Sequence, residues 1–197
     1  MNITTSLFLI FTQFYSPFIC KNSKNNSLNN QGCITARNNH IDFSIHGLWP
    51  EYTNNSYPSY CNQSAYFNIS TIKPIENQLN KYWLSYEADN PSFWKHEYLK
   101  HATCFPNVTQ LGFFQDGLNL YRQLNTTNFL KNNIKYDTNY NRSLMEQKFN
   151  GKFNCNETNN MYVDQFWKCF DLQLNGIDCP VWLNQNSCNK TINFHSW

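Results

Sequence analysis

The chain has 197 residues, of which 14% are charged and 17% aromatic, and its formal net charge at pH 7 is +2. This length suits one domain with a substantial core, and we expect that domain to span residues 1–197. The near-neutral charge argues against the broad basic surface of a duplex-binding protein and favours a small cleft with a local positive patch. Two Asn-rich stretches, 21–30 and 132–141, indicate loops.

Residues 1–20 allow two interpretations. The apolar run at 6–11 resembles a short signal-peptide core, but no Lys or Arg precedes it and no small-residue cleavage site is clear before Cys20. The alternative, which we favour, is a first strand from Leu7 to Tyr15, in which case an upstream signal would be missing from this chain. We expect no membrane span, because no apolar segment is long enough to be a transmembrane helix.

The segment Phe43 to Pro50, Phe-Ser-Ile-His-Gly-Leu-Trp-Pro, alternates as a strand does. The pattern predicts a strand ended by Trp49-Pro50, in which Ser44, His46 and Leu48 point one way. His46 would then project from a rigid sheet.

A helix is predicted to start near Ser92, with Ser92 as its N-cap, because the breaker pair Asn90-Pro91 precedes a stretch free of Pro and Gly up to Cys104. At roughly 100° per residue, four polar side chains fall within an arc of about 140°. They can therefore line one wall of a cleft: His96, Glu97, Lys100 and His101.

Histidines with a carboxylate and an ammonium group suit proton transfer around a phosphate, because a histidine titrates near pH ~6.5. A lone histidine is more often structural, but this clustering favours chemistry. Zinc is the sharper alternative, since His96-Glu97 opens like the zinc-protease signature; that motif needs a second His where Lys100 stands. We therefore expect neither a metal nor a cofactor. A Ser or Cys nucleophile is also disfavoured, because Thr103 lies beyond the polar arc and Cys104 is expected in a disulfide.

Eight cysteines, none spaced as in a zinc knuckle, indicate disulfides and an oxidising compartment. Sequence alone permits about a hundred pairings. Glycosylation sequons agree with a secretory route, and we expect N-glycans at some of them, including Asn62, Asn68, Asn107 and Asn156.

The two boxes around these histidines resemble those of the T2 ribonuclease family, secreted acid endoribonucleases that include the self-incompatibility ribonucleases. His-Gly-Leu-Trp-Pro at 46–50 is similar to the first active-site box, and Trp-Lys-His-Glu-Tyr-Leu-Lys-His-Ala-Thr-Cys at 94–104 to the second. The similarity extends through Ser56-Tyr57-Pro58, the helical pattern at 113–124 and the C-terminal cysteines. It implies an α+β fold, a mainly antiparallel β-sheet with helices packed on it, stabilised by disulfides.

The resemblance implies metal-independent cleavage of single-stranded RNA, with low base specificity, through a 2′,3′-cyclic phosphate. His101 would be the general base on the ribose 2′-hydroxyl and His46 the general acid for the leaving 5′-oxygen. The phosphate would be held by Glu97, Lys100 and His96. Because base and acid act on opposite sides of phosphorus, they should come from separate elements.

The resemblance also implies that Trp49 and Tyr57 stack on the nucleobase, although core packing is the alternative for both. Ala102 stands where the family usually has Gly, and Glu51 where it has Asp or Asn. If residue 102 needs a positive φ, Ala costs roughly 1 kcal/mol there and tilts His101; Glu51 leaves base preference open. The implied disulfides are Cys20–Cys33, Cys61–Cys104, Cys155–Cys188 and Cys169–Cys179.

We expect a monomer in a secreted, lysosomal or vacuolar setting. An alternative function is a secreted glycoprotein with a ribonuclease fold that acts mainly through a receptor or partner. A sugar-binding module, suggested by the aromatic residues, has no other support in the sequence.

Overall fold

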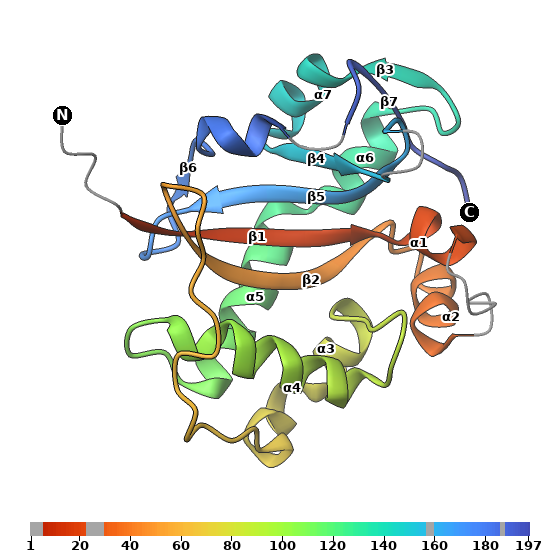
Figure 1. The fold of residues 1–197 in the computed structure, drawn as a ribbon. Helices are drawn as coiled ribbons and strands as arrows, with labels where there is room; N and C mark the ends of the chain where they lie inside the picture. Colours follow the sequence, from red (N-terminus) through yellow and green to blue (C-terminus); the bar gives the residue numbers. More distant parts are fainter. Residues whose placement is uncertain (1–5, 23–29, 157–159, 186–187) are drawn as a thin grey trace, which may run out of the picture.

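The computed structural model describes residues 6–22, 30–156, 160–185 and 188–197, which form an antiparallel sheet with helices packed on it (Figure 1). The α+β prediction is confirmed. The main sheet has the order β2-β1-β5-β4, with β6 also paired to β5, and its strands are β1 Leu7–Tyr15, β2 Phe43–Tyr52, β4 Lys152–Cys155, β5 Val163–Phe170 and β6 Gly176–Ile177. A second sheet pairs β3 Asn139–Asn141 with β7 Thr191–Asn193.

The described helices are α1 Ser16–Asn22, α2 Gln31–Asn38, α3 Glu76–Tyr82, α4 Asn90–Lys100, α5 Gln110–Leu124, α6 Thr126–Asn133 and α7 Arg142–Phe149. The 3₁₀ helices among the described residues are η2 Ile69–Ile75, η3 Ala102–Cys104 and η4 Val181–Gln185. The prediction of a loop over 132–141 is wrong at both ends, because residues 132–133 belong to α6 and residues 139–141 to β3. Of the stretch 21–30, residues 23–29 lie outside the described residues.

Strand β1 lies inside the sheet, paired with β2 on one side and β5 on the other. Its apolar side chains alternate between two buried clusters, with Leu9 and Phe11 in one and Phe8 and Ile10 in the other. A segment buried on both faces and paired on both edges is part of the fold, which favours the strand interpretation of Leu7 to Tyr15.

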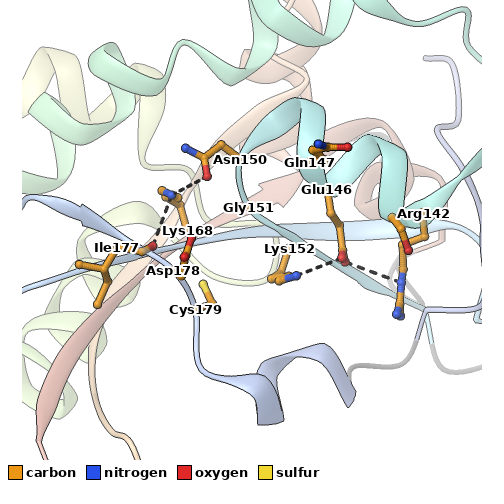
Figure 2. A pocket seen from close by; sticks show the side chains of 11 residues that line it. Arg142, Glu146, Gln147, Asn150, Gly151, Lys152, Lys168, Ile177, Asp178 and Cys179 are labelled. Atoms are coloured by element: carbon orange, nitrogen blue, oxygen red, sulfur yellow. Dashed lines mark hydrogen bonds and ion pairs between the residues drawn. The ribbon is translucent and has the colours of Figure 1, made fainter.

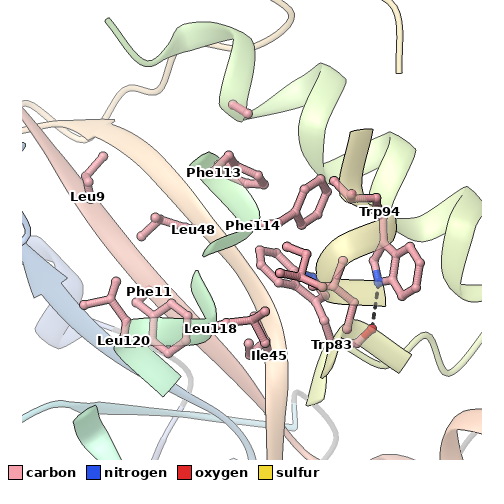
Figure 3. Close-up of a cluster of buried hydrophobic side chains, with 14 of the residues drawn as sticks. Leu9, Phe11, Ile45, Leu48, Trp83, Trp94, Phe113, Phe114, Leu118 and Leu120 are labelled. Atoms are coloured by element: carbon pink, nitrogen blue, oxygen red, sulfur yellow. Dashed lines mark hydrogen bonds between the residues drawn. The ribbon is translucent and has the colours of Figure 1, made fainter. Parts of the chain in front are cut away.

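The core beside the candidate site joins the sheet to α5 and α4 (Figure 3). Leu9 and Leu48 from the sheet lie opposite Phe113 of α5 in this cluster. Trp94 of α4 is fully buried, and its indole donates to the carbonyl of Trp83 over 2.8 Å. This contact anchors α4 to the core; Glu97, three residues further on, is buried as well, whereas His96 is exposed.

The cap of α4 differs from the prediction. Asp89 is the N-cap, and its carboxylate accepts from the backbone N–H of Ser92 over 2.9 Å, so Ser92 lies inside the first turn. Pro91 fits there because the first turn of a helix leaves its N–H groups unpaired in any case.

Strand β2 also departs from simple alternation. Gly47 pairs with Thr12 and Ile45 pairs with Gln13, so His46 is the extra residue of a β-bulge. Ile45 and Leu48, three residues apart, consequently pack into the same cluster. The strand runs on to Tyr52 and was not ended by Pro50, because β2 is an edge strand, where proline is tolerated.

The structure contains the four disulfides that the resemblance implies: Cys20–Cys33, Cys61–Cys104, Cys155–Cys188 and Cys169–Cys179. Among the helices that the structure describes, none is both long and apolar enough to cross a membrane.

Candidate active site

His46 sits at the bulge of β2, held on three sides. Its ring stacks on Phe14 with centroids 3.7 Å apart, its Nδ1 lies 3.3 Å from Oε1 of Gln165, and its carbonyl accepts from the indole of Trp83 over 2.9 Å. Burial lowers the pKa of His46 to about 3, against the hydrogen bond to Gln165, which raises it. The bulge and these contacts fix where the imidazole points.

His101 ends α4 as its C-cap, and its N–H donates to the carbonyl of Glu97 over 3.0 Å. The side chain is 6% exposed and lies against the indole of Trp49, with ring centroids 5.2 Å apart. Burial lowers the pKa of His101 to about 3, and the nearby charges of Lys100, His46 and His96 lower it further. The sheet and the helix therefore bring both imidazoles into one site.

Glu97 is the most buried member of the site, with 1% of its surface exposed. Its Oε2 accepts the indole N–H of Trp49 over 2.9 Å. Burial raises the pKa of Glu97 to about 8, although the Trp49 hydrogen bond and Lys100 act in the opposite direction. At mildly acidic pH this carboxyl group is therefore protonated and uncharged.

Gly47 makes room for that hydrogen bond. A Cβ at this position would lie 2.1 Å from Oε2 of Glu97 and 2.2 Å from Nε1 of Trp49, both far inside contact distance. Any side chain at residue 47 would push the two groups apart.

Lys100 and His96 complete the polar face of α4. His96 is exposed and Lys100 is partly buried. Burial and the charge of Lys100 together lower the pKa of His96. The predicted arc is thus present, but its members differ: Glu97 faces inward, whereas His96 meets solvent.

Trp49 contacts three other residues of the candidate site. It contacts His101 and Glu97 as above, and its ring meets that of His46 edge-on at a centroid distance of 4.7 Å. Tyr57, in contrast, is 62% exposed on the loop that follows β2. That loop is tied to the end of α4, because the N–H of Tyr60 donates to the carbonyl of Lys100 over 2.9 Å and Cys61 is bonded to Cys104.

Ala102 does not carry the strain considered above. It lies in the turn η3, is buried, and is not among the described residues with a positive φ. The Cβ of Ala102 therefore meets no backbone penalty, and the position of His101 is set by the helix end itself.

Gln165 is a site residue that the sequence interpretation missed. Its Oε1 accepts from the indole of Trp167 over 3.0 Å and faces Nδ1 of His46. The alternating pattern of β5 indicates that Gln165 and Trp167 lie on the same face of the strand. Nothing in the sequence indicates that this face lies next to His46. Within the described ranges, no group of three or more His, Cys, Asp or Glu side chains is arranged to hold a metal ion.

Comparison with known proteins identifies the class. The model of the Ribonuclease T2 family matches residues 6–179, and the chain belongs to that family. It is 33% identical over 177 residues to Ribonuclease DdI of Dictyostelium discoideum, covering 84% of this chain and 78% of that protein. It is 31% identical to Ribonuclease 1 of Arabidopsis thaliana, covering 96% of this chain and 86% of that one.

Solved structures share the fold. A crystal structure of RNase NT in complex with 5′-AMP superposes with a TM-score of 0.77 at 24% identity, covering 97% of this chain and 98% of that one. Ribonuclease MC1 from the seeds of bitter gourd gives a TM-score of 0.74 at 21% identity, over 96% of this chain and the whole of that one.

Proposed function

We propose that this T2-family ribonuclease is an endoribonuclease that cleaves single-stranded RNA by metal-independent transphosphorylation. The ribose 2′-oxygen attacks phosphorus, the 5′-oxygen leaves, and a 2′,3′-cyclic phosphate remains. The observation that carries the proposal is the pair of imidazoles, His46 from a strand and His101 from a helix end, which both contact the indole of Trp49. Two elements can thus serve opposite sides of one phosphorus.

His101 acts as the general base. Its lowered pKa keeps the imidazole neutral at mildly acidic pH, so it can take the proton of the 2′-hydroxyl. A negatively charged substrate phosphate beside it opposes the burial effect and raises the pKa toward the working pH, which strengthens the base in the complex.

His46 acts as the general acid through Nε2. The indole of Trp167 can only donate a hydrogen bond, so the Gln165 atom that it contacts must be the amide oxygen. The same oxygen faces Nδ1 of His46, and Nδ1 must therefore carry a hydrogen. Nε2 remains to be protonated when the phosphate binds and to pass that proton to the leaving 5′-oxygen.

The phosphate is held by Lys100 and by His96 once protonated, which offset the charge that builds on the phosphoryl oxygens. Glu97 belongs to the same site without repelling the phosphate, because at acidic pH its buried carboxyl group is neutral. Its role is to hold Trp49, and through Trp49 the spacing of the imidazoles. Tyr57 offers an exposed ring for stacking on a base.

The same proposal includes a monomeric, N-glycosylated protein in a secreted, lysosomal or vacuolar compartment. The four disulfides support an oxidising setting, since such bonds persist there.

The test is to incubate the purified protein with single-stranded RNA at mildly acidic pH in EDTA, beside its His46→Ala and His101→Ala variants. We expect cyclic-phosphate ends from the parent protein and a loss of cleavage in both folded variants. Near-normal cleavage by either variant removes the role assigned to that histidine, and inhibition by EDTA removes the metal-independent mechanism.

A further inference from the structure

A polar cavity lies at the edge of the sheet opposite the candidate active site. His46 is on β2, at one edge of the order β2-β1-β5-β4, whereas this cavity opens at the opposite edge, beside β4 and β6. Its volume is about 470 Å³, and its walls are α7, the start of β4 and the segment from β6 to Cys179 (Figure 2).

The cavity exists because β4 and β6 share one edge of β5 and leave a gap. Lys152 of β4 pairs with Trp167 and Ile177 of β6 pairs with Cys169, so Lys168 falls between the two pairings. The Cys169–Cys179 disulfide ties the β6 side to β5. The opening is therefore built into the strand order, independently of any side-chain rotamer.

Lys168 is the unusual group in this gap. It is 7% exposed, and its Nζ donates to two neutral oxygens, Oδ1 of Asn150 at 3.0 Å and the carbonyl of Ile177 at 3.4 Å. No ion pair of Lys168 is present in the part of the chain that the structure describes. Burial lowers its pKa, and Asp178 acts against that effect only through space. A buried ammonium group normally has a counter-ion.

Two further cations line the same cavity but are already engaged. Lys152 and Arg142 lie 3.3 and 3.8 Å from the two oxygens of the buried Glu146. Counting Asp178 as well, three cationic and two anionic side chains line the cavity, an excess of one positive charge, because Lys152 and Arg142 share the single carboxylate of Glu146.

We propose that this cavity binds a phosphate group, either free or as part of a nucleic-acid strand. A phosphodiester, or inorganic phosphate at mildly acidic pH, carries the one negative charge that the lining lacks. Lysine and arginine together are the common protein partners of phosphate oxygens. The site shares no residue with the candidate active site, so it stands whether or not the proposed reaction does.

The first test follows backbone amide resonances of the parent protein by NMR while inorganic phosphate is added at mildly acidic pH. The amides of Gly151, Lys152, Ile177 and Asp178 should shift in a saturable way. Shifts confined to Lys100 and His101 would show phosphate at the candidate active site alone and overturn the proposal.

The second test uses Lys168→Met, which keeps the length of the side chain and removes its charge. We expect phosphate affinity at the cavity to fall by about tenfold or more, since a hydrogen bond to a charged group is lost. Lys73→Met, on an exposed lysine of η2 outside the cavity, should leave it unchanged. Equal affinity in Lys168→Met would overturn the assignment to Lys168; if that variant does not fold, the titration of the parent protein decides.

A third measurement separates the two sources of phosphate. A single-stranded DNA oligonucleotide carries phosphodiesters but lacks the 2′-hydroxyl, so it is not cleaved. Shifts at both the cavity and the end of α4 support a strand that reaches both; shifts at the cavity with inorganic phosphate alone support a free anion. No cavity shift with either probe refutes the site.

Discussion

Trp49 donates its indole N–H to Oε2 of Glu97 over 2.9 Å, and this hydrogen bond joins the edge strand β2 to helix α4. Because the same indole contacts both imidazoles, the spacing of His46 and His101 depends on a carboxyl group that the proposed reaction does not otherwise use.

Trp49→Phe tests that dependence. The substitution keeps an aromatic ring but leaves the buried carboxyl of Glu97 without its donor, which should cost about 1–3 kcal/mol of unfolding free energy. We expect kcat/KM on a dinucleotide to fall by about tenfold or more. Urea unfolding and steady-state kinetics measure both. Trp182→Phe, which removes a 3.2 Å bond to the carbonyl of Thr53 away from the histidines, is the control; equal losses in activity would contradict the positioning role.

Gly47→Ala tests the same contact from the opposite side. The added Cβ would meet both Glu97 and Trp49, and overpacking of this kind costs about 1–3 kcal/mol. Thermal unfolding and activity should both decline. Gly176→Ala, whose Cβ would have 3.5 Å to its nearest neighbour, is the matched control, and a Gly47→Ala protein as stable and active as that control would show that the pair can separate without loss.

The buried carboxyl of Glu97 should leave a signature in stability against pH. Its folded pKa of about 8 is above the ordinary value of 4.5, so the native state binds more protons than the unfolded state between these pH values. Its stabilising contribution is complete below pH ~4.5 and is lost as pH rises toward 8.

Glu97→Gln imitates the neutral carboxyl and should gain stability relative to the parent protein over that window, by an amount on the order of a few kcal/mol. Chemical denaturation at several pH values checks it. The two histidines contribute with the opposite sign below pH ~6.5, but they are present in both proteins and cancel in the difference. Glu87→Gln, at an exposed position, is the control; parallel stability curves for parent and Glu97→Gln would contradict the raised pKa.

Gln165 should tune the general acid. Its hydrogen bond raises the pKa of His46, so Gln165→Met should lower that pKa and move the alkaline limb of kcat/KM to lower pH. Gln165→Glu, which places a negative charge at Nδ1, should move the limb the other way. The pH profiles of the two variants measure the effect, and a shift in the same direction for both would rule out the tuning role.

The Cys61–Cys104 disulfide should matter for activity as well as stability. It closes a separation of 43 residues, so replacing both cysteines with Ala should cost about 4 kcal/mol in the chain-entropy picture and release the loop of Tyr57 from the end of α4. Cys20–Cys33, with a separation of 13 residues, is the control: its removal should cost about 3 kcal/mol and leave kcat/KM near the parent value. Equal activity losses would show that the first bond has no special role at the site.

Much of the site was accessible from local sequence. The helical arc of α4 depends only on spacing along one helix, and it places His96 and Lys100 on one face as predicted. Helical spacing does not predict how deeply each side chain is buried. Glu97 is buried and His96 is exposed, because Trp49 of β2 covers Glu97.

The bulge at His46 was not predictable in the same way. A bulge is defined by the partner strand, and the shift occurs opposite Thr12 and Gln13 of β1, about thirty residues away in the chain. The position of Lys168 was unpredictable for the same reason. The sequence of β5 has an ordinary strand pattern, and Lys168 lies in a gap only because β4 and β6 pair with β5 on either side of it. Such features depend on long-range pairing, which local patterns do not specify.

Pro50 gives β2 a further property. An edge strand presents unpaired N–H and C=O groups to which another extended chain can add, and proline on such a strand withholds one donor. Pro50 follows Trp49 directly, so the row of donors is interrupted beside the candidate active site. Proline at this position therefore limits the pairing of another extended chain with this part of β2.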